Sequence, residues 1–168
     1  MRFILLGFIL MLSGNGIGQA ELPHLRKLFF ELPQKTDEFI QYNKNIRSSD
    51  HFVRCYQGAA IAMSAQQKDW PQDKLDAFSQ GRDLIEECIA KDPWNPELRF
   101  IRLTIQCQSP WFLGYNKEIE NDCKVIADHS SLKYINTKDE YWQKVYTFIL
   151  SQKNINENQK KLIKPFRV

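Results

Sequence analysis

The sequence feature that most constrains this fold is a helix start signal in the middle of the chain, followed by a nearly continuous apolar stretch. In the segment DPWNPELRFIRLTIQCQ, residues 92–108, Asn95 can cap a helix through its side-chain oxygen. Pro96 suits the first helical position because that position needs no N–H partner, and Glu97 lies favourably near the positive end of the helix. Ser109 and Pro110 predict the end of this helix.

Apolar side chains cover most of the circumference of this expected helix, and Arg99, Arg102 and Gln106 form a narrow polar stripe. The apolar residues form two rows: Leu98, Ile101 and Ile105, and beside them Phe100, Leu103 and Cys107. Such a helix needs neighbours on most sides, so we expect it at the centre of a helical domain. The loop of Trp111, Phe112 and Leu113 follows at once, and we expect it to fold back onto the core before Gly114.

The rest of the chain has the apolar spacing of helices joined by short connections. Helices are expected at about 21–32, 36–46, 50–67, 72–91, 116–129 and 137–150, with a weak final one at 157–163. Thr137 and Glu140 have the spacing of a capping box. No segment shows convincing period-two alternation. The sequence predicts an all-α fold of antiparallel helix pairs, stacked as a small bundle or short solenoid of about seven helices.

The first twenty residues, MRFILLGFILMLSGNGIGQA, have the order of a secretory signal peptide. A positive Arg2 precedes an apolar run from Phe3 to Leu12, and small residues precede a cut after Ala20. The alternative is an uncleaved anchor, but the run is shorter than the roughly 20 residues that span a bilayer. We therefore expect a signal peptide at 1–20 and a single helical domain at 21–168. The mature protein would be exported to the periplasm or the extracellular space, with no membrane span.

Charge and cysteine patterns narrow the possible partners. The formal net charge is +3, and acids and bases are mixed along the chain, so nothing resembles a nucleic-acid footprint. The four cysteines have no close C-x-x-C spacing, which argues against a metal or redox site, and no cofactor is expected. If the helices flanking Trp70-Pro71 pair antiparallel, Cys55 and Cys88 lie at comparable heights and can form a disulfide. The alternative is that all four cysteines are small buried apolar residues.

Small residues predict one close helix contact and carry a family resemblance. Gly58, Ala62 and Ala65 let another helix approach closely. Gly81, Ile85, Cys88 and Pro93 stand at the relative spacing found in the second helix of a tetratricopeptide repeat, which this part of the chain resembles. The match covers half of one repeat, and Trp70-Pro71, Arg102 and Leu103 depart from it. The resemblance implies stacked antiparallel helix pairs.

A second resemblance spans most of the chain after residue 20. The segments YQGAAIAM, residues 78–89 and PELRFIRLTIQ…PWFLGY are similar to those of a small group of exported helical proteins of Bacteroidota-type bacteria. This resemblance brings no activity with it.

The polar stripe of the central helix is the best site candidate in the sequence. Two guanidinium groups on a mostly buried helix need carboxylates or an anionic ligand, because an unpaired buried charge is costly. Arg99 and Arg102, with Tyr115 near one end, can hold an anion or a peptide carboxylate. Alternatively, they pair within the fold with acids such as Glu86, Glu118 or Asp122. The side chains of Trp94 and Trp111 flank this helix and either rim a groove or cover the ends of the core.

Three functions remain open at this point. The first is a non-catalytic module that binds a protein or peptide partner, or acts as a scaffold, in the cell envelope. The second is a small exported hydrolase that uses His51 or His129 with scattered acids; no known catalytic motif is present. The third is a carrier with an apolar cavity between helices. That cavity would be lined by residues such as Phe52, Met63, Phe78 and Trp142.

Overall fold

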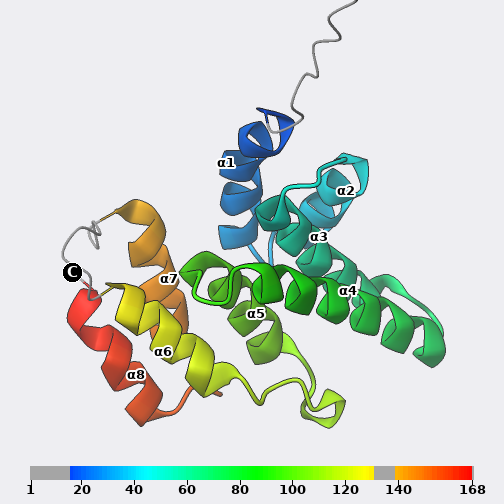
Figure 1. Ribbon diagram of the computed structural model, residues 1–168. Coiled ribbons are helices and arrows are strands. Elements are labelled where there is room, and N and C mark those ends of the chain that lie inside the picture. Colours follow the sequence, from blue (N-terminus) through cyan, green and yellow to red (C-terminus); the bar gives the residue numbers. More distant parts are fainter. Residues whose placement is uncertain (1–15, 131–138, 168) are drawn as a thin grey trace, which may run out of the picture.

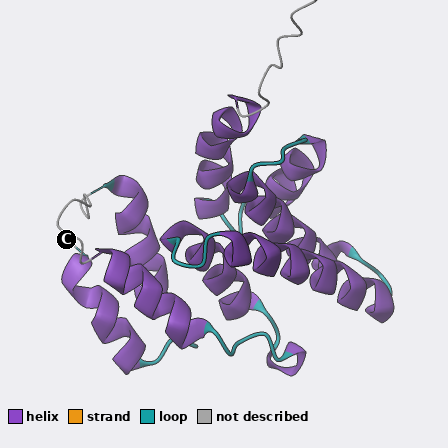
Figure 2. Cartoon of the chain, viewed as in Figure 1, coloured by secondary structure: helices purple, strands orange, loops and turns teal. Residues whose placement is uncertain are grey.

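Helices account for all the regular secondary structure in the computed structural model, which describes residues 16–130 and 139–167 (Figure 1). No strand occurs within those ranges, and short loops join the helices (Figure 2). The α-helices are α1 (Gly16–Phe30), α2 (Thr36–Asn45), α3 (His51–Ser64), α4 (Pro71–Lys91), α5 (Pro96–Gln108), α6 (Ile119–Ser130), α7 (Glu140–Ser151) and α8 (Glu157–Ile163). Three short 3-10 turns accompany them: η1 (Ala65–Gln67), η2 (Trp111–Leu113) and η3 (Lys164–Phe166). The all-α prediction is confirmed.

Successive helices form antiparallel pairs that stack on one another. Contacts join α1 to α2, α3 to α4, α5 to α6, and α7 to α8. Between pairs, α3 contacts α1, α2 and α5, and α6 contacts α8. Asp50, Asn95 and Asp139 cap the first helices of the last three pairs through their side chains. The predicted stack of helix pairs is therefore present, with eight described helices instead of about seven.

The predicted central helix is correct at both ends. Asn95 accepts hydrogen bonds from the backbone N–H groups of Glu97 and Leu98, and α5 runs from Pro96 to Gln108. Every residue from Pro96 to Gln106 is buried. Because α3, α4 and α6 all pack against α5, this helix lies at the centre of the fold.

Helices α3 and α4 approach each other closely at Gly58 and Gly81. A Cβ atom placed on Gly81 would lie 2.3 Å from the backbone nitrogen of Ala62 and 2.5 Å from the carbonyl oxygen of Gly58. Glycine therefore sets the distance between the two helices. The predicted small-residue contact is confirmed.

Two expected boundaries differ from the structure. Helix α1 begins at Gly16, so the expected cut after Ala20 falls within a helix; the apolar run from Phe3 to Leu12 lies outside the described residues. Helix α7 begins at Glu140 with Asp139 as its cap, which accepts a hydrogen bond from the N–H of Tyr141. Thr137, the expected cap, also lies outside the described residues. A capping box is present instead at the start of α8.

Candidate functional site

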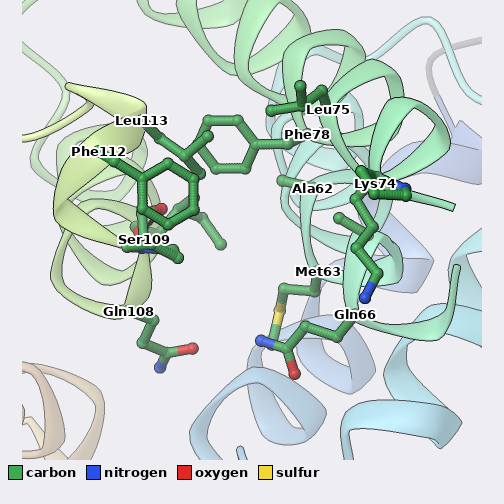
Figure 3. A pocket seen from close by; sticks show the side chains of 14 residues that line it. Ala62, Met63, Gln66, Lys74, Leu75, Phe78, Gln108, Ser109, Phe112 and Leu113 are labelled. Carbon is green, nitrogen blue, oxygen red and sulfur yellow. Dashed lines mark hydrogen bonds between the residues drawn. The ribbon is translucent and has the colours of Figure 1, made fainter. Parts of the chain in front are cut away.

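An apolar groove lies between the α3–α4 pair and the end of α5 (Figure 3). Its volume is about 520 Å³, which is within the roughly 300–1,000 Å³ typical of ligand sites. Fourteen residues line it: Ala62, Met63, Ala65, Gln66, Pro71, Lys74, Leu75, Phe78, Ile105, Gln108, Ser109, Pro110, Phe112 and Leu113. We call this site the apolar groove.

The chain builds the two walls of the groove from local signals. One wall is the first two turns of α4, where Pro71, Lys74, Leu75 and Phe78 share a helix face. The other wall is η2, which follows directly after Ser109-Pro110 ends α5. In Figure 3 the rings of Phe78 and Phe112 and the side chain of Leu113 lie across the groove from Met63 and Gln66.

Two apolar side chains of the loop after α5 are exposed, although the composition of the loop predicts that they are buried. Phe112 is 66% exposed and Trp111 is 85% exposed, so the expectation that these side chains fold back onto the core is wrong. Leu113, in contrast, packs against the core. A 3-10 helix has three residues per turn, so three consecutive side chains point in three different directions and cannot all face the core. Gly114 then turns the chain away in the left-handed conformation, with φ of 63°.

Exposed apolar side chains concentrate around the apolar groove. Leu75, which lines it, is 44% exposed, and Trp70, which directly precedes the lining residue Pro71, is 73% exposed. Leu75 and Phe112 line the groove, and Trp70 and Trp111 directly precede lining residues in the sequence; the other two exposed large apolar side chains in the described chain are Trp94 and Leu162. Clustered exposed apolar surface of this kind marks interaction sites in folded proteins.

Lys74 is the one charged residue among those lining the groove. No ion pair joins it to another described residue. The remaining polar side chains there are Gln66, Gln108 and Ser109, and the hydroxyl of Ser109 already donates to the carbonyl of Ile105. The groove is therefore apolar with a single free cation at its edge.

The two arginines predicted as site residues are paired inside the fold. Arg102 donates to both carboxylate oxygens of Asp122, at 2.9 and 2.6 Å, and to Glu86 at 2.7 Å. Arg99 donates to Asp122 at 3.1 Å and to the carbonyl of Pro93 at 2.8 Å. The structure thus has the internal pairing that the sequence left as an alternative to an anion site.

Burial and charge act in opposite directions on this network. Burial raises the pKa of the Asp122 carboxyl, while the guanidinium groups of Arg102 and Arg99 lower it. Gln106 also donates to Asp122, at 2.8 Å, so the whole predicted polar stripe of α5 is directed at this one carboxylate. Tyr115 donates to Glu86 at 2.7 Å, and burial raises its pKa strongly. Asp122 and Glu86 already accept hydrogen bonds from the guanidinium groups. The network therefore holds α4, α5 and α6 together.

A second buried ionic cluster had no sequence signal that identified it. Arg26 of α1 forms a two-pronged ion pair with Glu97, at 2.8 and 2.6 Å, and the hydroxyl of Tyr56 donates to the same carboxylate at 2.8 Å. Glu97 is 6% exposed, although its position in the first turn of α5 suggested only a favourable helix-end charge. These residues are far apart in the sequence, so only the fold brings them together.

The two tryptophans and Tyr115 do not form one site with the arginines. Trp94 is 75% exposed and does not line the apolar groove. Trp111 and Tyr115 line a smaller, polar cavity of about 370 Å³ on the other side of η2. The sequence left two alternatives for these tryptophans: they rim a groove or they cover the ends of the core. Trp111 borders a cavity, and neither Trp94 nor Trp111 is buried against the core.

The histidines show no catalytic arrangement among the described residues. The Nε2 atom of His51 is buried without a hydrogen-bond partner. The ring of His129 lies 5.6 Å from that of Trp142, and burial lowers its pKa. Neither histidine lines the apolar groove or the smaller cavity beside η2, and no group of three or more side chains that could hold a metal ion occurs in the described ranges.

Cys55 and Cys88 lie next to each other across the α3–α4 contact. Both are buried free thiols, and they lie close enough for each to shift the pKa of the other. Burial raises the pKa of Cys55, whereas the interaction with Cys55 lowers that of Cys88. The proximity that the sequence suggested is correct, and the disulfide itself remains a prediction.

Comparison with known proteins gives no family for this chain. Family models, curated proteins and solved structures were compared with it, and none matches. Within the described residues, none of the helices has the length and apolar character needed to cross a membrane.

Proposed function

We propose that this protein is a non-catalytic helical module that binds a protein or peptide partner in the apolar groove. The observation that carries the proposal is the exposure of Phe112 and Leu75 on opposite walls of that groove. Leaving two large apolar side chains in water costs free energy that a partner recovers by covering them, about 1.5–3 kcal/mol for each fully buried side chain. Aromatic residues in such positions are often the main anchors of protein interfaces.

The stacked helix pairs and the N-terminal sequence support a scaffold role in the cell envelope. Stacked helix pairs form extended surfaces that hold partner segments, and the apolar groove lies where the α3–α4 pair meets α5 of the next pair. Residues 1–20 have the order of an export signal. We therefore place the binding event outside the cytoplasm, in the periplasm or the extracellular space.

Site-specific photo-crosslinking in the native cells tests this function. A photoreactive phenylalanine analogue replaces Phe112, and a matched control carries it at Leu162, which is 42% exposed on α8 and does not line the groove. A discrete protein adduct at position 112 that is absent at position 162 is expected. Identical adducts at both positions, or none at 112, would remove the groove as a protein-binding site.

The carrier of an apolar ligand is the second candidate, because the groove includes two of the residues expected in such a cavity. Met63 and Phe78 line it, whereas Phe52 and Trp142 do not. Native mass spectrometry of the purified protein separates the two functions. A bound lipid that is lost with Phe78→Ala supports the carrier, and its absence together with a protein adduct at Phe112 supports the interaction module.

A further inference from the structure

We propose that the segment bound in the apolar groove is an amphipathic helix of the partner protein, with its apolar face against Phe78, Leu75 and Phe112 and a carboxylate side chain beside Lys74. This inference rests on the proposed function and specifies the partner's chemistry. Three properties of the groove support it: its polar groups, its shape and its charge.

The polar groups of the groove favour a helix over an extended strand. An extended segment brings backbone N–H and C=O groups that need partners when they are covered. The groove offers the amides of Gln66 and Gln108 and the hydroxyl of Ser109, whose proton is already donated to Ile105. A helix satisfies its own backbone and presents apolar side chains at spacings of three and four, so it can cover the groove without unpaired groups.

The shape of the surface favours an elongated occupant. Gln108 lines both the apolar groove and a neighbouring cavity of about 540 Å³, which lies between α1, α5 and α7. Phe30, Phe100 and Phe148 contribute to that second cavity. The two hollows therefore meet at Gln108 of α5, and together they form an elongated surface that suits a helix, which rises 1.5 Å per residue.

The charge of the groove selects an acidic partner. Lys74 lies on the same face of α4 as Leu75 and Phe78, and Figure 3 shows its side chain reaching along the groove mouth towards Gln66. It is the one cation in the lining and has no ion pair with a described residue. A carboxylate on the bound helix would pair with it, and a lysine or arginine there would be repelled.

Selection from a displayed peptide library tests the inference on the full chain. The library presents a stable helix randomised at its exposed positions, and it is screened against the unmodified protein and against Lys74→Glu. We expect binders with apolar residues at i, i+3 or i+4, and i+7 and an adjacent Asp or Glu. The acidic binders should lose about tenfold in affinity for Lys74→Glu, and screening against that variant should yield Lys or Arg at the same position.

Controls distinguish failure of the charge argument from failure of the site. Lys124→Glu on the exposed face of α6 changes net charge equally and should leave affinity unchanged. Binders that require Phe112 and Phe78 but ignore Lys74→Glu overturn the acidic-helix inference and leave the groove as a protein site. A library without binders sensitive to Phe112→Ser overturns both, as does an acyl-chain amphiphile that native mass spectrometry finds seated in the groove.

Discussion

At the scale of single residues, Gly81 sets the spacing between α3 and α4, and its replacement by alanine tests that contact. Alanine in a helix interior normally gains about 1 kcal/mol over glycine. Here the added Cβ would lie 2.3 Å from the nitrogen of Ala62, against backbone that cannot rotate away. Overpacking of this kind costs about 1–3 kcal/mol or more, so Gly81→Ala should lower the free energy of unfolding in urea by about 2 kcal/mol net.

The neighbouring exposed residue Gln80 provides the control for that measurement. Gln80→Ala changes a surface position of the same helix and should shift the unfolding free energy by less than about 0.5 kcal/mol. A Gly81→Ala protein as stable as the original would mean that α3 and α4 are further apart than the structure places them.

Asp122 is the second residue on which many contacts converge. Arg99, Arg102 and Gln106 all donate to its carboxylate, which is fully buried. Asp122→Asn removes the negative charge and leaves two guanidinium groups poorly compensated, and breaking a buried pair in this way costs about 3–5 kcal/mol. Thermal and urea unfolding of the variant measure the loss.

Glu118 is a matched acid at the edge of the same network. Its carboxylate lies 3.6 Å from Arg102 and its side chain is 46% exposed, so Glu118→Gln should cost less than about 1 kcal/mol. Equal losses for the Asp122 and Glu118 variants would contradict the view that Asp122 is the buried centre of the network.

At the scale of the helices, the sequence predicts the elements well because their signals are local. Asn95 and Pro96 fix the start of α5 within two residues, and Ser109 fixes its end, so the predicted and observed helices coincide. The loop after it shows the limit of this reasoning. Trp111 and Phe112 are apolar enough to predict burial, yet whether they are covered depends on how α4 packs against the end of α5.

The α3–α4 pair gives a prediction that involves two elements at once. Because Cys55 and Cys88 are in contact, oxidised glutathione should convert them to one disulfide, with the glutathione reduced in exchange. The closed loop would stabilise the fold by about 3–4 kcal/mol on chain-entropy grounds. Peptide mapping identifies the pair, and unfolding with and without a phosphine reductant measures the gain.

Cys107 and Cys123 serve as the comparison for this oxidation. Burial raises the pKa of each of these thiols to about 12, whereas the pKa of Cys88 is lowered, so Cys88 is the thiol expected to attack the glutathione disulfide first. A mapped bond between any other pair of cysteines, or four thiols still titrating after long oxidation, would exclude the predicted link.

At the scale of the whole molecule, the site is harder to predict than the fold. Residues at 62–66, 71–78 and 105–113 line the apolar groove, and no periodicity places these three segments together. The arginine stripe was visible in the sequence because it repeats on one helix, and that pattern left both internal pairing and a ligand site open. Its partner Asp122 is on the following helix, so the choice between internal pairing and a ligand site required the three-dimensional structure.

The stacked arrangement also predicts how the molecule loses structure. Ile163 of α8 is fully buried, and α8 contacts α6 and α7 but packs little against the first two pairs. Ile163→Ala should cost about 2–5 kcal/mol. In a stack, each pair is stabilised by its neighbours, so hydrogen exchange followed by mass spectrometry should speed up in α6, α7 and α8 while α3 and α4 keep their protection.

Leu162→Ala, at the half-exposed neighbouring position, should leave the exchange pattern unchanged. A uniform acceleration from α1 to α8 would instead describe one cooperative bundle, in which the groove between α4 and α5 opens whenever any helix does.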